Sequence, residues 1–254
     1  MVGTGAGGVV MKVLDLFSGI GGFSLGLERA GMETIAFCEF EPHAQKILAK
    51  HWPNIPIHDD VRTLDGKQYR GTVDVVCGGF PCQDLSNAGR QKGFDGSRST
   101  LYIEMLRIIS ECLPPYAIFE NVSGLLTGES GRWFAQFLYD LAEIGYDAEW
   151  HCISASAVGA NHHRDRVWVI AYPKMQRCKR RTKEQVLGEP RLQVKLMRSF
   201  ERWPNRQDIP TPRTVGADDG LPMRLDRITR LGNAVVPQIP EAIGRAIIEY
   251  EANR

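Results

Sequence analysis

The chain has 254 residues, with 31 Lys and Arg residues against 30 Asp and Glu residues and a hydrophobic content of 43%. These values are typical of a globular protein with a buried core, and they exclude a disordered, fibrous or collagen-like chain. No apolar run reaches the roughly 18 residues of a membrane-spanning helix, and the first ten residues lack the basic and apolar regions of a secretory signal. We therefore expect a cytoplasmic protein whose six Cys residues, none of them in a CxxC pair, are reduced thiols.

Short apolar runs alternate with helical patterns, which predicts an α/β protein with a doubly wound, mostly parallel sheet. Strands are expected at Lys12–Phe17, Thr34–Glu39, Ile55–His58, Val73–Cys77, Tyr116–Phe119, Ala148–Ile153 and Val167–Ala171. Helices are expected at Gly22–Ala30, Pro42–His51, Thr100–Cys112, Trp133–Ile144 and Pro237–Ala252. The last two strands follow each other without a helix, so one of them is expected to be antiparallel.

The same reading divides the chain into three parts. Residues 1–10 are Gly-rich and are expected to be flexible, whereas residues 11–172 and 231–254 together form the folded α/β domain. Residues 173–230 show no lasting periodicity and are interpreted as an insert or small subdomain.

Charge is unevenly distributed along the chain. Residues 173–231 contain 15 Lys and Arg residues but only 7 Asp and Glu residues, whereas the rest of the chain is net acidic. A basic segment in an acidic body predicts a polyanionic partner, of which nucleic acid is the usual one. The alternative interpretation is an Arg-rich surface insert exposed to solvent.

A glycine-rich loop, Asp15 to Gly22, lies where the first strand turns into a helix, which allows a ligand to approach the backbone closely. Glu39 follows at the end of the second strand, where an acidic residue typically binds the hydroxyls of an adenosine ribose. A dinucleotide fingerprint would require Gly in place of Ser24, so the pattern favours S-adenosylmethionine over a pyrophosphate ligand. Asp60 adds an acceptor for an adenine amino group; the alternative for the whole loop is a purely structural turn.

Cys82 follows the fourth strand and is surrounded by Gly, Pro, Gln and Asp rather than by apolar residues. A thiolate at the carboxyl edge of the sheet is a suitable nucleophile for an electron-poor carbon. Most free Cys residues are buried small hydrophobes, and this is the role expected for those in apolar runs, namely Cys38, Cys77, Cys112 and Cys152. The polar stretch 85–100 beside Cys82 is a candidate mobile lid.

Glu120 ends the fifth predicted strand, where apolar neighbours favour its protonated form and thus proton donation to a ring nitrogen. The alternative is a strand-end carboxylate that pairs with a neighbouring cap. Arg164 and Arg166 alternate before the last strand, so both side chains point to one side and are suited to bind a carboxylate or a base carbonyl. His162 and His163 suggest a metal, but no ligand at suitable spacing completes a site, so no metal is expected.

Five motifs occur in the order DLFSGIGGFSLGLE, GGFPCQDLS, FENV, HHRDRVW and LGNAVVPQIPEAIG. In this combination the chain resembles the DNA cytosine-5 methyltransferases over Val13–Tyr172 and Leu231–Ile248, and its short middle region is similar to that of compact phage and prophage members. The resemblance implies a Rossmann-like class I S-adenosylmethionine-dependent methyltransferase fold with a seven-stranded sheet. It also implies that residues 173–230 form the target-recognition region.

The resemblance implies that Cys82 attacks C6 of a flipped-out cytosine in double-stranded DNA, that Glu120 contacts the N3/N4 edge, and that Arg166, helped by Arg164, contacts the O2 side. The implied cofactor-binding residues are Phe17, Gly19, Gly21, Gly22, Glu39, Phe40, Asp60, Val61, Gly79, Pro81, Leu101, Asn233 and Ala234. The implied DNA-binding residues are Gln83, Ser86, Arg90, Lys92, Arg98, Arg213 and Arg227. The chain departs from relatives at two places. His162–His163 lies outside this chemistry, and Ala88 lies on the loop that follows Cys82.

The sequence alone leaves open several alternatives to a monomeric DNA methyltransferase. An RNA cytosine-5 methyltransferase on the same scaffold is the nearest, since a basic segment serves either polymer. A non-catalytic adenosyl- or DNA-binding module would have no need for Cys82, Glu120 and both arginines together. An NAD-dependent oxidoreductase is disfavoured by Ser24.

Overall fold

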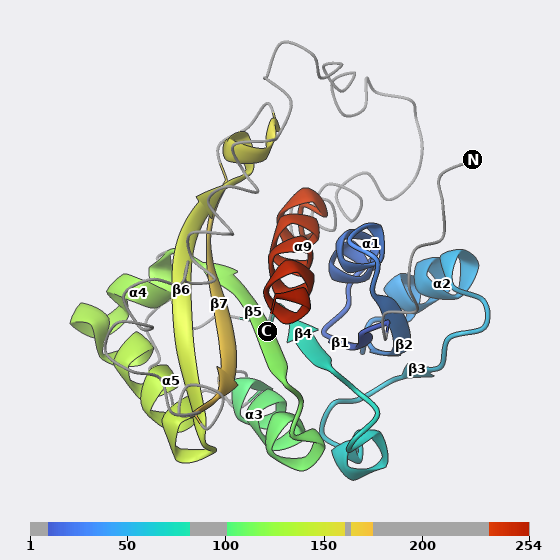
Figure 1. Ribbon diagram of the computed structural model, residues 1–254, viewed down its shortest axis with the longest axis horizontal. Helices are drawn as coiled ribbons and strands as arrows, with labels where there is room; N and C mark the ends of the chain where they lie inside the picture. Colours follow the sequence, from blue (N-terminus) through green and yellow to red (C-terminus); the bar gives the residue numbers. More distant parts are fainter. Residues whose placement is uncertain (1–9, 82–100, 161–163, 175–233, 254) are drawn as a thin grey trace.

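The computed structural model describes residues 10–81, 101–160, 164–174 and 234–253. These residues form a seven-stranded sheet in the order β3-β2-β1-β4-β5-β7-β6 (Figure 1). The strands are β1 (Lys12–Leu16), β2 (Glu33–Cys38), β3 (Ile57–His58), β4 (Val75–Gly78), β5 (Tyr116–Val122), β6 (Tyr146–Ser154) and β7 (Asp165–Pro173). Strands β1 to β5 pair in parallel, whereas β7 runs antiparallel to both β5 and β6. The structure confirms the predicted α/β sheet and its antiparallel component.

The expected helices are present, and each end lies within one residue of the prediction. They are α1 (Gly22–Arg29), α2 (Pro42–His51), α3 (Leu101–Cys112), α5 (Arg132–Glu143) and α9 (Gln238–Ala252). Several short helical segments were not predicted, because none is long enough to show a period: η1 (Gly66–Tyr69), α4 (Gly124–Thr127), η2 (Gly128–Gly131) and η3 (Ala155–Val158).

All seven strands differ in their bounds from the prediction, by one to three residues at an end. For β5, β7 and β3 the reason is visible in the pairing or the sequence. β5 continues three residues beyond the predicted end because Glu120, Asn121 and Val122 pair with β7. For the same reason β7 begins at Asp165, so that Arg166 lies inside the strand rather than before it. β3 is shorter than predicted, and Pro56, which precedes it, has no N–H to donate to a ladder although its carbonyl accepts from the Phe37 N–H.

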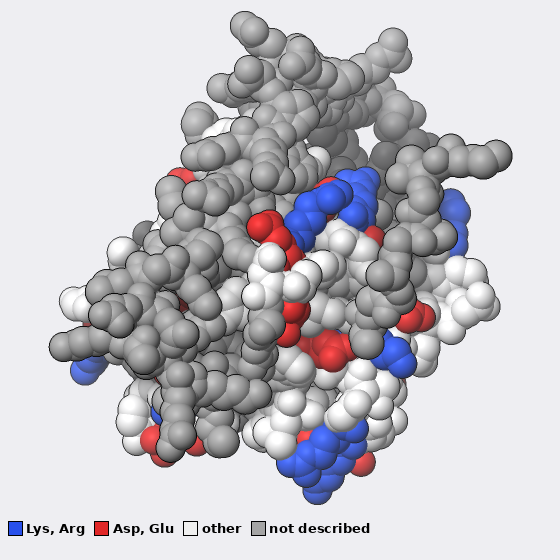
Figure 2. All heavy atoms as spheres, in the orientation of Figure 1, with Lys and Arg blue, Asp and Glu red and all other residues white. Residues whose placement is uncertain are grey.

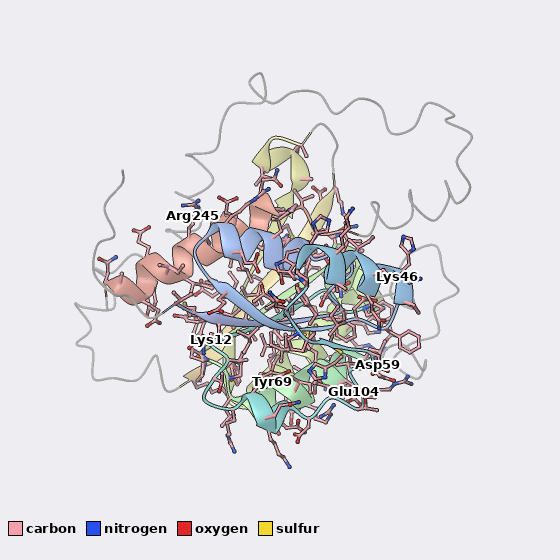
Figure 3. All side chains as sticks on the ribbon, turned by 90° about the vertical axis from the view of Figure 1, so that its right-hand side faces the viewer. Lys12, Lys46, Asp59, Tyr69, Glu104 and Arg245 are labelled. Carbon is pink, nitrogen blue, oxygen red and sulfur yellow. The ribbon has the colours of Figure 1, made fainter. Side chains whose placement is uncertain are left out.

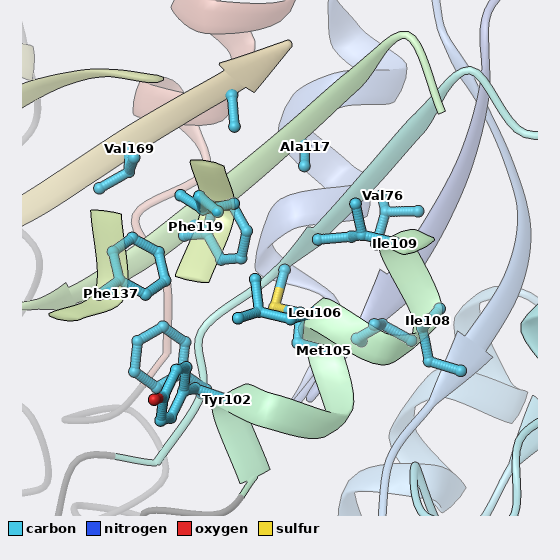
Figure 4. Close-up of a cluster of buried hydrophobic side chains, with 14 of the residues drawn as sticks. Val76, Tyr102, Met105, Leu106, Ile108, Ile109, Ala117, Phe119, Phe137 and Val169 are labelled. Atoms are coloured by element: carbon cyan, nitrogen blue, oxygen red, sulfur yellow. The ribbon is translucent and has the colours of Figure 1, made fainter. Parts of the chain in front are cut away.

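Each face of the sheet is covered by helices over a buried apolar cluster. One cluster joins the inner side chains of α3 and α5 to the sheet; Figure 4 shows part of it, including Val76, Met105, Ile109, Phe119 and Phe137. The other joins α1 and α9 to the opposite face, which includes Val13, Ile118 and Trp168. The two helical layers bury the sheet on both sides, as its nearly continuous apolar strands predict.

Helices α1 and α9 come from opposite ends of the chain and pack against each other without room for larger side chains. A Cβ atom on Gly26 would lie 2.2 Å from the carbonyl oxygen of Pro237, and one on Gly22 would lie 2.7 Å from that of Val235. From the other helix, a Cβ on Gly244 would lie 2.8 Å from the Cβ of Ala30. The last helix therefore closes the domain onto the helix that follows β1.

Most of residues 1–10 and of the basic segment 173–230 lie outside the described residues, so the predicted three-part division stays a prediction. On the face seen in Figure 2, acidic and basic side chains of the described part are interspersed. Among the described residues, no helix is both long and apolar enough to cross a membrane.

Candidate active site

The carboxyl ends of four neighbouring strands place the predicted site residues in one row. The register pairs Leu16 with Cys38 and with Gly78, and pairs Gly78 with Phe119. The next residues along these strands are Glu39, Phe17, Gly79 and Glu120. Since neighbouring strands lie about 4.8 Å apart, the row extends roughly 14 Å from Glu39 to Glu120. The structure thus brings together residues that are 81 positions apart in the sequence.

The glycine-rich loop at this edge turns through left-handed backbone conformations. Phe17, Gly19 and Gly21 have φ values of 53°, 55° and 86°, which glycine adopts readily and Phe does not. A Cβ atom on Gly19 would meet no atom of the described residues within 4 Å, so that part of the structure leaves the space over the loop open. Gly21, by contrast, lies against the Trp52 ring, 2.6 Å from where its Cβ would be. One glycine thus permits close approach of a ligand and the other permits packing.

Glu39 connects this loop to the end of β2. Its Oε2 accepts a hydrogen bond of 2.7 Å from the Gly19 N–H, and its Oε1 accepts one of 2.8 Å from the Glu41 N–H. The ring of Phe40, next to it, is 72% exposed. A fixed carboxylate beside an exposed aromatic ring is suited to bind a ribose and to stack on a purine.

Asp15 and Ser24 explain why the loop does not have the dinucleotide fingerprint. The hydroxyl of Ser24 donates a hydrogen bond of 2.7 Å to Oδ2 of Asp15, which is fully buried in β1 under α1. Burial raises the pKa of Asp15 to about 7, and the hydrogen bonds from Ser24 partly offset this rise. Glycine at position 24 would leave this buried carboxyl without that donor.

Asp60 lies two residues beyond β3 and is held by a neighbour that the sequence reading did not single out. Arg62 donates to Oδ1 of Asp60 from Nε at 2.9 Å and to Oδ2 from Nη2 at 2.6 Å. These hydrogen bonds lower the pKa of Asp60. Val61 is buried beside it. The two-residue spacing of an acid and an Arg was the available signal for this pair.

Glu120 forms an ion pair with Arg166, whose Nε lies 3.0 Å from Oε1 of Glu120. The pair is diagonal across β5 and β7, because Glu120 faces Trp168 and Val122 faces Arg166. Burial raises the pKa of Glu120, while the charges of Arg166 and then Arg164 partly offset the rise. The structure therefore places the predicted carboxylate and both arginines together, in surroundings that favour a proton on Glu120 more than water does.

Gly79 lies directly beside this carboxylate. A Cβ atom on Gly79 would be 3.0 Å from Oε2 of Glu120, closer than side chains normally pack. On the opposite face of β5, Nδ2 of the buried Asn121 donates a hydrogen bond of 3.2 Å to the carbonyl of Phe80. Asn121 belongs to the FENV motif, which by itself predicts no role for it; alternation along the strand places it on the face opposite Glu120.

Several predicted site residues lie outside the described residues: Cys82, Gln83, Ser86, Arg90, Lys92, Arg98, Arg213, Arg227, Asn233, and the pair His162–His163. Pro81, which precedes Cys82, is exposed at the end of the segment that begins with β4, and Leu101 begins α3. Ala234 lies just before α9, and Gly22 begins α1. Within the described residues, no group of three or more His, Cys, Asp or Glu side chains is suited to hold a metal ion.

Comparison with known proteins gives a family match over most of the chain. The model for C-5 cytosine-specific DNA methylases matches residues 11–211. The type II methyltransferase M2.BsuMI of Bacillus subtilis is 38% identical over 165 residues, which are 63% of this chain and 42% of that protein. The type II methyltransferase M.Eco47II of Escherichia coli is 39% identical over 165 residues, 64% of this chain and 39% of that protein. The chain thus spans about two fifths of the length of these curated relatives.

Solved structures show the same fold. A prophage-encoded E. coli protein, described as a DNA modification methyltransferase, aligns with a TM-score of 0.66 and 20% identity, covering 95% of this chain and 99% of that one. The Dnmt2 methyltransferase of Schizosaccharomyces pombe aligns with a TM-score of 0.56 and 20% identity, covering 81% and 61% of the two chains. At these identities the likeness concerns the fold alone.

Proposed function

Because the chain belongs to the family of C-5 cytosine-specific DNA methylases, we propose that it transfers a methyl group from S-adenosylmethionine to C5 of a cytosine in double-stranded DNA. The observation that supports this most directly is the row of residues at the carboxyl edge of the sheet. It has a nucleoside-binding end at Glu39 and a proton-donating end at Glu120, about 14 Å apart. An extended ligand across this edge would bring its reactive group toward Gly79 and Glu120.

The residues present fit the proposed methyl donor. The open space over Gly19, the exposed ring of Phe40 and the carboxylate of Glu39 would hold its adenosine, and Asp60 would accept from the adenine amino group. The absence of a Lys in the glycine loop is consistent with a ligand that has no phosphate. When bound, S-adenosylmethionine supplies an electrophilic methyl group on a sulfonium.

Glu120 and Cys82 would make C5 of the cytosine nucleophilic. The thiolate of Cys82 forms a bond to C6, and the electron pair of the C5–C6 double bond becomes available at C5 while negative charge develops at N3. Glu120, whose pKa is raised by burial, donates a proton to N3. After C5 has been methylated, a base such as water removes the C5 proton, the C6–sulfur bond breaks, and the N3 proton returns to Glu120.

Arg166 and Arg164 would orient the reacting partners. The contact between Arg166 and Glu120 fixes the carboxyl group at the site, and further guanidinium donors can bind the O2 side of the base. Since C5 of a paired cytosine cannot be reached inside the helix, the base must be flipped into this pocket. The stretch 83–100 and the basic segment 173–230 are proposed to contact the DNA, the latter as the target-recognition region; we propose that the enzyme works as a monomer in the cytoplasm.

The test is transfer of radiolabelled methyl groups from S-adenosylmethionine to duplex DNA. We expect incorporation into cytosine with the wild-type protein, none with Cys82→Ala, and a stable covalent conjugate with DNA containing 5-fluorocytosine. Undiminished labelling by Cys82→Ala would contradict the role of the thiolate.

Parallel reactions with duplex DNA and with tRNA distinguish the proposed DNA substrate from the alternative RNA substrate. Labelling of tRNA in preference to duplex DNA would show that the scaffold acts on RNA. Binding of S-adenosylmethionine without methyl transfer to either polymer would favour a non-catalytic module.

A further inference from the structure

Arg107, on α3, donates hydrogen bonds to backbone carbonyls of a distant part of the chain, which an arginine on a solvated helix face normally does not. Its Nη2 donates a hydrogen bond of 2.8 Å to the carbonyl of Val61, and its Nη1 donates one of 3.1 Å to the carbonyl of Leu64. Both carbonyls belong to the segment that follows β3, more than 40 positions away in the sequence. One guanidinium group thus connects α3 to two backbone carbonyls of another part of the chain.

Two glutamates on the same helix hold this guanidinium in place. Oε2 of Glu104 lies 2.8 Å from Nε of Arg107, and Oε1 of Glu111 lies 3.0 Å from Nη1. Glu111 also reaches the same segment, because its Oε2 accepts a hydrogen bond of 2.8 Å from the N–H of Gly66. The thiol of Cys112, at the end of α3, also donates a hydrogen bond of 3.2 Å to the carbonyl of Gly66. Residues 61–66 are therefore bonded to α3 at four backbone groups, in a part of the molecule that Figure 3 shows with Asp59, Tyr69 and Glu104 labelled.

The fastened segment and the helix both begin with residues proposed to line the donor pocket. Val61 starts the segment, Asp60 directly precedes it, and Leu101 starts α3. Within the described residues, the side chain of Asp60 is bonded to Arg62, through its backbone N–H and its exposed guanidinium, so its position depends on the backbone around it. Hydrogen bonds from a charged group to carbonyls are stronger than neutral ones, and exposed ion pairs contribute little by comparison.

We propose that Arg107 is a positioning residue for the methyl-donor pocket, holding the backbone of residues 61–66 so that Asp60 presents its carboxylate to the adenine. The inference rests on the proposed function, since it concerns the ligand of that site. A lysine does not replace the arginine, because one ammonium group lacks the planar fork that donates to both carbonyls and both carboxylates. Arg107 itself touches neither the donor nor the cytosine in this scheme.

The test is the affinity for S-adenosylhomocysteine, the demethylated product, measured by calorimetry on the full chain. We expect Arg107→Met to raise the Kd by about tenfold or more and Arg107→Lys to raise it by less, in line with the loss of charge-assisted hydrogen bonds. Hydrogen exchange of the amides in residues 61–66 should accelerate in both variants while the amides of β1 and β4 stay protected. Arg245→Met, which removes an exposed ion pair with Glu241 on α9 without touching the segment or Arg107, should leave the Kd and the exchange unchanged.

Each outcome has a separate meaning. If the wild-type protein does not bind S-adenosylhomocysteine, the proposed function is wrong. If it binds and the folded Arg107→Met variant binds equally well, the positioning role is wrong. Should Arg107→Met fail to fold, Arg107→Lys decides, because wild-type affinity together with wild-type exchange in that variant would overturn the inference.

Discussion

The buried carboxyl group of Asp15 makes the stability of the fold depend on pH, and Asp15→Asn should remove this dependence. Asp15 lies fully buried in the central strand β1, near Cys77 and Glu39, and burial raises its pKa from 3.8 to about 7. Asparagine has nearly the same shape and keeps an oxygen that can accept from the hydroxyl of Ser24. The substitution therefore removes the ionisation with little change in packing.

Proton linkage sets the direction in which the free energy of unfolding changes with pH. The folded protein binds the Asp15 proton more tightly than the unfolded chain does, so the stabilisation is fully present below pH about 3.8 and is lost as the pH rises through about 7. A pKa difference of about 3 units corresponds to about 4 kcal/mol at high pH. Between about pH 5 and about pH 8, this amounts to a loss of roughly 2–3 kcal/mol in the free energy of unfolding.

The assay is urea denaturation of the wild-type protein and of Asp15→Asn at these two pH values. The wild-type protein should lose roughly 2–3 kcal/mol more than the variant over this range. The cost of burying the amide of Asn changes the free energy of unfolding of the variant by the same amount at both pH values. It therefore cancels when the two values are subtracted. Asp65→Asn, at an exposed cap of η1, should show the wild-type dependence; equal pH dependence of wild type and Asp15→Asn would refute the reasoning.

Two further predictions concern packing and chemistry. Gly26→Ala should lower the free energy of unfolding by about 2 kcal/mol or more, since its Cβ would lie 2.2 Å from the carbonyl oxygen of Pro237; thermal denaturation checks this, with the exposed Leu25→Ala as the control expected to change little. Glu120→Gln keeps the shape beside Gly79 but donates no acidic proton, so single-turnover methyl transfer should slow by at least about 100-fold with unchanged affinity for S-adenosylhomocysteine. A near-normal rate would exclude Glu120 as the proton donor.

Hydrophobic periodicity and the positions of Gly and Pro predicted the helices and strands of the fold well, because both are local features of the sequence. The helices predicted at Gly22–Ala30, which Gly31 follows, and at Pro42–His51, which Pro42 begins, have the same ends in the structure to within one residue. The bounds of β5 and β7 were missed because Glu120 and Arg166 are charged and interrupt the apolar runs. Their place in the ladder depends on a partner strand nearly 50 residues away, which a local pattern does not contain.

The site was predictable where a residue's role follows from its position at a strand end. Glu39 and Glu120 were identified in this way and Gly79 from the family resemblance, and the structure places all three along one edge. Arg107 was not, because its spacing from Glu104 and Glu111 is typical of a solvated helix face. Only the folded chain shows that its guanidinium turns away from its own helix toward distant carbonyls.

The closure of α9 onto α1 has a consequence for how such a protein can diversify. β7 is fixed between β5 and β6, and α9 is fixed by the glycine contacts at Gly22, Gly26 and Gly244. The stretch between Lys174 and Ala234 therefore connects β7 and α9, which are both packed into the described fold. If residues 173–230 have the proposed role in target recognition, grafting a foreign sequence in their place would change the DNA sequence that is recognised and leave the described strands and helices as they are.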